Sequence, residues 1–297
     1  MSGLEALVAG GLVRERVALA PLTTYKFGGP ARYLAEPADE GDLSVIAATR
    51  GDVPVLVLGR GSNVVISDHG FDGLVLVPAM AEIIFHDDGG VTAGAGVPQP
   101  VLARRAVAAG RGGLEFMVGI PGSVGGAVAM NAGCHGSETR ERLVTARIVD
   151  LVSGRGSDRT PDQLEMGYRR SSVRPTDVVV AATFRTTPRA PAEGEAAIRE
   201  ITRWRRDHQP GGTFNAGSVF KNPPGDAAGR IIEAVGLKGY RIGGASVSER
   251  HANFFVADTG ASPQDVFDLV RSVRRRVQEE TGVLLETEIR FIGEFDS

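Results

Sequence analysis

The chain has 297 residues, of which 42% are hydrophobic, and a formal net charge of -3 at pH 7. This length is enough for about two or three domains with proper hydrophobic cores. The charge argues against a general nucleic-acid binder, which needs a basic surface for phosphate contacts. No apolar run has the length of a membrane helix, and residues 1–20 lack the basic start of a signal peptide. We expect a cytoplasmic protein that binds no nucleic acid and inserts into no membrane.

The cysteine content and the charge pattern indicate which kinds of site and compartment suit this protein. The single cysteine, Cys134, excludes an internal disulfide framework and suits a reducing compartment. We predict no metal site. The run Arg274, Arg275 and Arg276 lies in a periodic apolar pattern, which is typical of the solvated face of a helix.

Three segments of different character follow one another along the chain. In residues 1–78, short apolar runs between Gly, Asp and Asn predict strands at VPVLVLG, VVISD and GLVLVP, with a helix at DLSVIAATR. Residues 79–190 continue with strands at EIIFH, VTAGAG, RLVTARIVD and DVVVAATFRT, and a helix at PQPVLARRAVAAG.

The third segment, residues 191–297, is more helical. The stretch PRAPAEGE, residues 188–195, spans the start of this segment. Its Pro, Ala and Glu content is typical of a linker. Helices are predicted at EAAIREITRWRRDH, DAAGRIIEAVG and SPQDVFDLVRSVRRRVQEE, and a final strand at VLLETEIRFIG.

Glycine is concentrated in the stretch GLEFMVGIPGSVGGAVAMNAG, residues 113–133, where Glu115 is the only charged residue. Backbone amides without side chains suit the close approach of a phosphate, although a run of tight turns has the same composition. The P-loop pattern GxxxxGK[ST] is absent. A second glycine-bearing loop, GRGSN at residues 59–63, begins like GxGxxG but is followed by a predicted strand, so a Rossmann fold is excluded. The two loops, 59–63 and 119–126, can hold one extended diphosphate together.

Six motifs, in order and spacing, carry a family resemblance. They are VLGRGSNVVISDHGFDGLVL, GLEFMVGIPGSVGGAVAMNAG, GYRRSS, NAGSVFKNP, GLKGYRIGGASVSERHANF and LETEIRFIG. From about residue 23 to residue 293 the chain resembles the UDP-N-acetylenolpyruvoylglucosamine reductases.

The resemblance implies an α+β fold: a two-part FAD-binding fold of the vanillyl-alcohol-oxidase type, in residues 1–78 and 79–190, plus a C-terminal α+β substrate-binding domain, in residues 191–297. The final strand is expected to return towards the active site. Non-covalent FAD, NADPH as co-substrate and a UDP-sugar substrate are implied with it. No insertion follows Tyr168, so the chain resembles the shorter branch of the family.

The family motifs also imply which residues bind the cofactor. The implied FAD contacts are Tyr25, Gly59, Arg60, Gly61, Ser62, Asn63, Gly119, Ile120, Pro121, Gly122, Ser123, Gly125, Gly126, Asn131 and Gly133.

Three residues match the family's catalytic positions: Ser218 as proton donor, Arg169 as catalytic arginine and Glu288 as catalytic glutamate. A planar guanidinium suits a carboxylate bidentately, as the role of Arg169 requires. In a strand, Glu286 and Glu288 share a face, so only the family motif selects Glu288.

Substrate contacts are predicted at Tyr168, Lys221, Asn222 and His251, with Arg206 as a looser match. Tyr168 also suits a core position, and the others also suit exposed polar positions.

Two other functions stay open at this point. Cys134 and His135, directly after the glycine-rich stretch, would suit a covalent flavin oxidase of the same superfamily, although a buried cysteine more often acts as a small hydrophobe. A flavin-binding module without catalysis is the second alternative.

Overall fold

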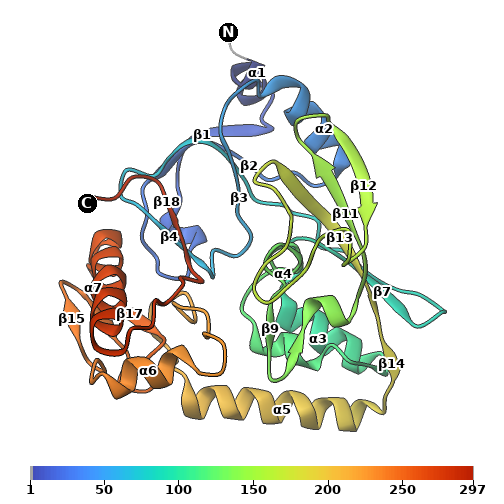
Figure 1. Ribbon diagram of the computed structural model, residues 1–297. Coiled ribbons are helices and arrows are strands. Elements are labelled where there is room, and N and C mark those ends of the chain that lie inside the picture. The colour runs from blue at the N-terminus through green and yellow to red at the C-terminus, as the bar shows by residue number, and fades with distance from the viewer. Residues whose placement is uncertain (1–2, 297) are drawn as a thin grey trace. The chain divides into compact units, whose positions relative to one another are not determined.

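The computed structural model describes residues 3–296. The chain forms two compact units, each built from separate stretches of sequence (Figure 1). Among the described residues, the first comprises residues 3–17, 32–60 and 73–204, and the second comprises residues 18–31, 61–72 and 205–296. The first unit therefore holds most of both predicted FAD-binding segments. The boundary predicted at residue 78 stays a prediction.

A four-stranded sheet lies largely in the first unit. Its order is β1 (Val13–Ala18), β2 (Pro30–Ala35), β5 (Phe71–Leu76) and β3 (Val55–Val57). The helices α1 (Gly3–Ala9) and α2 (Glu40–Thr49) share a hydrophobic cluster with this sheet through Leu4, Leu43 and Ile46. The carboxylate of Asp39 accepts the N–H of Asp42 at 3.0 Å and so caps α2 where the sequence predicts a helix.

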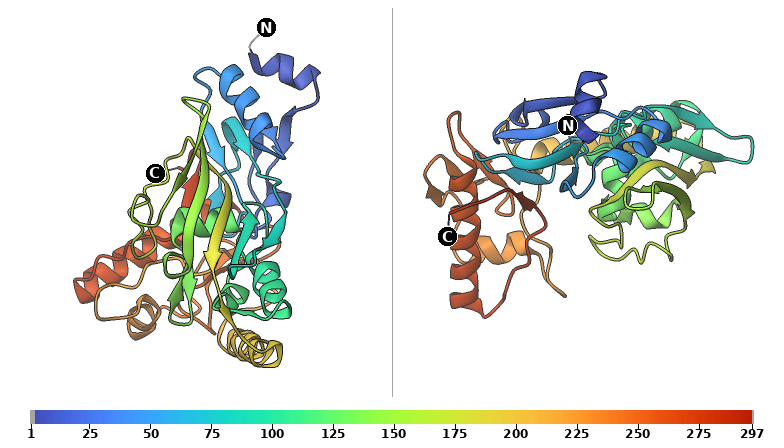
Figure 2. Two further views of the ribbon diagram at one scale, coloured as in Figure 1. Left: turned by 90° about the vertical axis from the view of Figure 1, so that its right-hand side faces the viewer. Right: turned by 90° about the horizontal axis from the view of Figure 1, so that it is seen from above.

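A five-stranded antiparallel sheet forms the centre of the first unit's main core. Its order is β12 (Arg155–Arg159), β11 (Leu143–Asp150), β13 (Asp177–Arg185), β7 (Gly90–Gly94) and β6 (Ile83–Phe85). The long strands β11 and β13 run side by side in Figure 1 and in the left view of Figure 2. These positions confirm the strands predicted at residues 82–86, 91–96, 142–150 and 177–186.

The first unit also contains helices, two of which lie within the glycine-rich stretch. They are α3 (Gln99–Ala108), the 3₁₀ helix η2 (Glu115–Gly119), α4 (Val124–Met130), the 3₁₀ helix η3 (Thr139–Glu141) and α5 (Pro191–His208), the last of which continues into the second unit. Two short antiparallel pairs complete the unit, β8 (Arg111–Gly112) with β14 (Thr187–Pro188), and β9 (Gly133–Cys134) with β10 (Ser137–Glu138).

The linker predicted at residues 188–195 is wrong for residues 191–195, which lie in helix α5. Helix α5 begins at Pro191, because proline is well suited to the first turn of a helix, where its missing N–H is not needed. A Cβ at Gly194 would lie 2.7 Å from Cγ1 of Val107 in α3, so this glycine allows the two helices to pack closely. Residues 191–195 are therefore structural rather than a spacer.

The second unit places helices on a small antiparallel sheet. The sheet order is β15 (Arg241–Ile242), β16 (Ala245–Val247) and β17 (Phe255–Ala257), and the remaining elements are the 3₁₀ helix η1 (Ala20–Leu22), β4 (Val64–Ile66), α6 (Ala228–Ala234), α7 (Pro263–Thr281) and β18 (Arg290–Ile292). Strand β4 confirms that a strand, not a helix, follows the loop 59–63.

Helix α7 shows how local sequence sets both ends of an element. Ser262 and Asp265 form a capping box at its start, and Gly282 ends it with a φ of 74°. Buried Val266, Leu269 and Val273 form its apolar stripe, whereas residues 274–276 are exposed. The prediction of a solvated arginine face is confirmed.

The final predicted strand is shorter than expected. Only residues 290–292 form a strand, β18, which pairs in parallel with β4. Residues 283–288 are irregular apart from an isolated β-bridge between Thr287 and Phe220. The alternation argument for Glu286 and Glu288 therefore fails, because it assumes a regular strand.

Candidate active site

Two glycine-bearing loops meet inside the first unit. One contains Gly59, shortly after β3, and the other is residues 119–123, called here the glycine loop, which leads into α4. A Cβ at Gly59 would lie 2.5 Å from Oγ of Ser123, so this approach requires a glycine. Oγ of Ser123 accepts the N–H of Gly126 at 3.3 Å and caps α4. Gly59 and Ser123 therefore lie in contact, while the diphosphate site predicted between the two loops stays a prediction.

The glycine loop fits a phosphate-bearing cofactor. It carries no charged side chain, and Gly122 and Ser123 are buried. The amides that follow it, of Val124 and Gly125, donate to the carbonyls of Val97 and Ala95 at 2.9 Å and hold it against the sheet. A fixed main chain without bulky side chains suits the close approach of a pyrophosphate, so the residues present fit FAD.

Residues 61–63 of the loop 59–63 belong to the second unit. Gly61 has a φ of +58°, and a Cβ there would overlap the carbonyl of Leu22. Nδ2 of Asn63 donates to the carbonyl of Glu288 at 3.0 Å, and the N–H of Arg290 donates back to the carbonyl of Asn63 at 3.0 Å. Asn63 therefore anchors the main chain at the predicted catalytic glutamate.

Arg169 lies in a tight turn of the first unit, residues 167–170, called here the arginine turn. The N–H groups of Gly167 and Arg170 each donate to the other's carbonyl at 3.1 Å. Arg169 has a φ of +52°, a conformation in which glycine is usual at this position of a turn. Its Nη2 donates to the carbonyl of Gly133 at 2.6 Å, and its guanidinium lies 5.0 Å from the ring centre of Tyr168, which is exposed. The structure thus brings the predicted residues Arg169, Tyr168 and Gly133 together.

Asn131 is fully buried at the end of α4. Its Nδ2 donates to the carbonyl of Gly167 at 2.8 Å, and its Oδ1 accepts the N–H of Arg140 at 2.9 Å. Because its exposed fraction is 0%, it offers a cofactor no surface. We therefore remove Asn131 from the predicted FAD contacts and assign it to the arginine turn.

Ser218 and Glu288 lie on neighbouring main-chain segments of the second unit. Ser218 forms a β-bridge with Phe254, and the N–H of Glu288 donates to the carbonyl of Val219 at 2.8 Å. Both side chains are half-buried. Two predicted catalytic residues that are 70 positions apart are thereby brought to adjacent positions.

Asn253 holds this arrangement together and was missed from the sequence. Its Oδ1 accepts the N–H of Phe220 at 2.9 Å, its Nδ2 donates to the carbonyl of Phe220 at 2.8 Å, and its own carbonyl accepts the N–H of Val219 at 2.8 Å. It is 3% exposed. A polar residue inside the apolar run HANFFVA is the signal that could have identified it, since a buried amide needs partners.

Lys221 and Asn222 follow Ser218 in residues 218–222, called here the serine segment. Nζ of Lys221 contacts Oε1 of Glu286 at 2.5 Å, and the side chain of Glu286 is 72% exposed. Oδ1 of Asn222 accepts the N–H of Ala228 at the start of α6, at 3.1 Å. The main chain of both acids lies beside residues 218–222, since the N–H of Lys221 also donates to the carbonyl of Glu286 at 2.9 Å. The two side chains differ in exposure, because Glu286 is exposed and Glu288 is half-buried. The assignment of the catalytic role to Glu288 stays a prediction.

His251 lies half-buried beside α6. Its Nδ1 accepts the N–H of Asn253 at 3.2 Å, and its ring packs edge-on against Phe254 at 4.8 Å. Burial lowers the pKa of His251 below its usual value of 6.5. Arg206 is exposed and pairs with Asp207.

Tyr25 is a core residue. It is 1% exposed, its hydroxyl donates to the carbonyl of Phe255 at 2.9 Å, and its ring stacks on Phe27 at 4.9 Å. Burial raises the pKa of its hydroxyl. We therefore remove Tyr25 from the predicted FAD contacts, because little of its surface remains for a ligand.

Cys134 is half-buried and packs as a small apolar residue. Its Sγ donates to the carbonyl of Phe116 at 3.0 Å and it packs against the main core of the first unit. His135 occupies the turn between β9 and β10 and lies edge-on to Trp204 at 5.0 Å. These contacts favour a packing role for Cys134 over flavin attachment.

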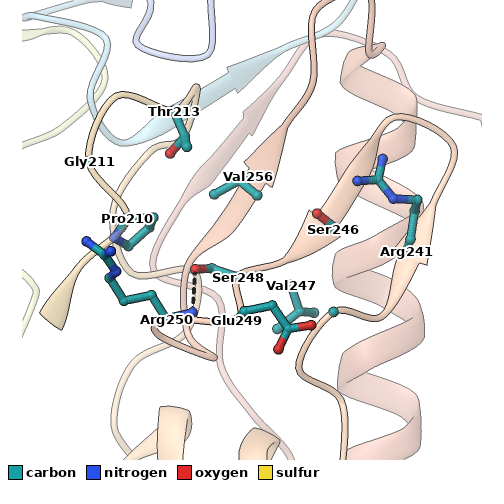
Figure 3. Close-up of a pocket in the computed structure, with 11 residues that line it drawn as sticks. Pro210, Gly211, Thr213, Arg241, Ser246, Val247, Ser248, Glu249, Arg250 and Val256 are labelled. Atoms are coloured by element: carbon teal, nitrogen blue, oxygen red, sulfur yellow. Dashed lines mark hydrogen bonds between the residues drawn. The ribbon is translucent and has the colours of Figure 1, made fainter.

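The second unit also carries a cavity of about 430 Å³, shown in Figure 3. Its lining includes Ser246, Arg241 and Arg250 but none of the predicted site residues. Arg241 is paired with Asp258 at 2.6 Å, and Nη1 of Arg250 donates to the carbonyl of Arg206 at 3.0 Å. We do not assign the chemistry to this cavity, since its cations already have partners.

Within residues 3–296, no cluster of three or more His, Cys, Asp or Glu side chains suits a metal ion. Nor does this part of the chain contain a helix that is long and apolar enough to span a membrane.

Comparison with known proteins first defines the class. Residues 31–156 match a family model described as an FAD binding domain. A Phl p 4 variant described as a glucose oxidase shares the fold with a TM-score of 0.51 at 14% identity, over 70% of this chain and 50% of that one. The predicted α+β fold with a two-part FAD-binding region is confirmed, and the chain is a flavoprotein of this class.

The family follows from closer matches. Residues 209–292 match the model of the C-terminal domain of UDP-N-acetylenolpyruvoylglucosamine reductase. The reductase of that name from Nitrobacter hamburgensis is 42% identical over 280 residues, which are 93% of this chain and 91% of the relative. The crystal structure of the Thermus caldophilus enzyme superposes with a TM-score of 0.82 at 37% identity, over 95% of this chain and 100% of that one. This chain belongs to the UDP-N-acetylenolpyruvoylglucosamine reductase family, as its six motifs indicate.

Proposed function

We propose that this chain reduces UDP-N-acetylenolpyruvoylglucosamine to UDP-N-acetylmuramate, a step in peptidoglycan precursor synthesis, with non-covalent FAD and with NADPH as co-substrate. The observation that carries the reaction is the 42% identity to a reductase of that name over 93% of this chain. The cytoplasm, where such precursors and NADPH meet, is the proposed location.

The cofactor-holding residues are the main chain of the glycine loop and of the loop 59–63. Their close approach at Gly59 and Ser123, where a Cβ would lie 2.5 Å from Oγ, supports this assignment. When bound, FAD takes up reducing equivalents from NADPH and supplies a hydride to the enolpyruvyl CH2 carbon of the substrate.

Ser218 is the proposed proton donor to the carbon next to that CH2 group. A serine hydroxyl is a weak acid, but an enolate-like carbon is basic enough to take its proton. Glu288 is the proposed second acid, and its position on the segment next to Val219 supports the pairing of the two roles. Lys221, Asn222 and His251 are proposed to contact the substrate.

Arg169 is the proposed partner of the substrate carboxylate, on which negative charge develops during the reaction. A cation already fixed in place stabilises such charge without further reorganisation, and removing one such donor typically lowers the rate by about a hundredfold to a thousandfold. The positive φ of Arg169 supports a functional role, because strained backbone is concentrated at functional sites.

An anaerobic absorbance experiment tests the proposal. One equivalent of NADPH should bleach the flavin, and adding the enolpyruvyl UDP-sugar should restore the oxidised spectrum with one equivalent of product. A flavin that bleaches and then stays reduced would contradict the proposed substrate. A protein that cannot be reconstituted with FAD would contradict the cofactor assignment as well.

A further inference from the structure

The C-terminal end of α4 holds the arginine turn from both sides. Oγ of Ser171, just after the turn, donates to the carbonyl of Ala129 at 2.7 Å. Nδ2 of Asn131 donates to the carbonyl of Gly167, at the start of the turn, at 2.8 Å. The guanidinium of Arg169 itself reaches the carbonyl of Gly133 at 2.6 Å. All of these contacts lie within the first unit.

Asn131 is the central residue of this set. Its φ of 44° is a left-handed conformation that asparagine tolerates better than most residues. Its side-chain oxygen accepts from the N–H of Arg140, and Nη1 of Arg140 donates to the carbonyl of Met166 at 3.0 Å, next to the turn. The amide nitrogen of Asn131 therefore bonds the arginine turn directly, and its oxygen does so indirectly through Arg140.

The arginine turn needs such support. Arg169 has a positive φ, which is disfavoured for a residue with a Cβ and persists only where the surroundings enforce it. Without the bond from Asn131, the turn can relax to a conformation that points the guanidinium elsewhere.

We propose that Asn131 is a positioning residue for Arg169, which it holds in the orientation that receives the substrate carboxylate. The inference rests on the proposed role of Arg169. Asn131 is thereby assigned a structural role in place of the expected FAD contact. Its substitution should change substrate binding and reduction rather than FAD binding.

Two substitutions separate the possible roles of the side chain. Asn131→Asp keeps the size, the tolerance for positive φ and the acceptor for the N–H of Arg140, but it turns an oxygen instead of an N–H towards the carbonyl of Gly167. Asn131→Gly removes both side-chain bonds without backbone strain. Ser171→Ala removes the other anchor of the turn and serves if neither variant at position 131 folds.

The experiment measures substrate binding and the two half-reactions of the FAD-loaded enzyme. Calorimetric titration of the oxidised enzyme with the enolpyruvyl UDP-sugar should show Kd raised about tenfold in Asn131→Asp. Reoxidation of the reduced flavin by this substrate should slow by on the order of a hundredfold, since a misplacement of about 1 Å can have that effect. FAD affinity and reduction by NADPH should stay within about twofold, because the role proposed for Arg169 is towards the substrate carboxylate alone.

A double-mutant cycle with Arg169→Ala decides the case. If Asn131 acts through Arg169, Asn131→Asp slows an Arg169→Ala enzyme by no more than about twofold further. Independent, multiplying losses would overturn the inference, and so would equal losses in both half-reactions. Wild-type substrate affinity in Arg169→Ala would instead overturn the proposed role of the arginine itself. Ser262→Ala, which removes the cap of α7, is the control for simple destabilisation and should leave the ratio of the two half-reaction rates unchanged.

Discussion

Gly59→Ala tests whether the two glycine loops meet as described. A Cβ at this position would lie 2.5 Å from Oγ of Ser123 but 3.6 Å from its Cβ. The second distance is an ordinary van der Waals contact, so the new methyl group conflicts with the hydroxyl alone. The hydroxyl must move, and it then loses the bond by which it caps α4 through the N–H of Gly126.

The expected loss equals the loss of one N-cap. Removing a capping serine typically lowers the unfolding free energy by about 1 kcal/mol. For a folded unit of roughly 150–250 residues, this lowers Tm by about 2–4 °C. Ser123→Ala should give a similar loss, because it removes the same hydrogen bond. The double variant should lose no more than Ser123→Ala does, since the methyl group then has room.

Thermal unfolding of the four proteins, followed by circular dichroism with and without FAD, measures this coupling. Gly211→Ala is the matched control, because its Cβ would meet nothing within 4 Å and its φ is not positive. Losses that add in the double variant would refute the reasoning, because they would show that the hydroxyl does not lie where the methyl group is introduced.

The remaining predictions concern the second unit. Ser218→Ala should keep flavin reduction by NADPH within about twofold but slow reoxidation of the flavin by the substrate by about a hundredfold or more. Stopped-flow absorbance measures both steps, and equal losses in the two would contradict the proposed role of Ser218. Glu288→Gln should likewise slow reoxidation of the flavin by the substrate and spare its reduction by NADPH. Glu286→Gln should change the reoxidation rate by less than about fivefold, because Glu286 forms a mainly exposed ion pair. A larger effect of Glu286→Gln than of Glu288→Gln would assign the catalytic role to Glu286. Burial lowers the pKa of His251 below 6.5, so the unfolded chain binds the proton more tightly and stability falls as pH drops below that value. His251→Gln should flatten the pH dependence of the urea midpoint in this window, and an unchanged slope would contradict the lowered pKa.

Elements whose signals are local were predictable from the sequence. Helix α7 has a capping serine, an apolar stripe and a terminal glycine within its own residues. The predictions that were wrong concern stretches whose local sequence pattern is compatible with two structures. Proline at residue 191 is compatible with a linker and with the first turn of a helix, and only packing against α3 distinguishes them. Residues 283–288 alternate like a strand, but their partner is the serine segment, which admits only one isolated bridge.

The site shows the same division. The types of residue needed for the chemistry, Ser218, Arg169 and Glu288, were visible in short motifs. Their supports were not, because a support is defined by what it touches. Asn253 and Asn131 are ordinary polar residues in the sequence, yet each is almost fully buried and bonds the main chain of a segment far along the chain.

Glycine in residues 113–133 serves packing as much as ligand approach. A Cβ at Gly125 would lie 3.0 Å from Cβ of Ala95, and one at Gly133 would lie 2.6 Å from the carbonyl oxygen of Ser137. These contacts fix α4, a helix of seven residues and therefore about 10 Å long, at both ends. Its start follows the glycine loop and its end holds the arginine turn. One short helix therefore connects the proposed cofactor contacts of this unit with the residue proposed to bind the substrate carboxylate.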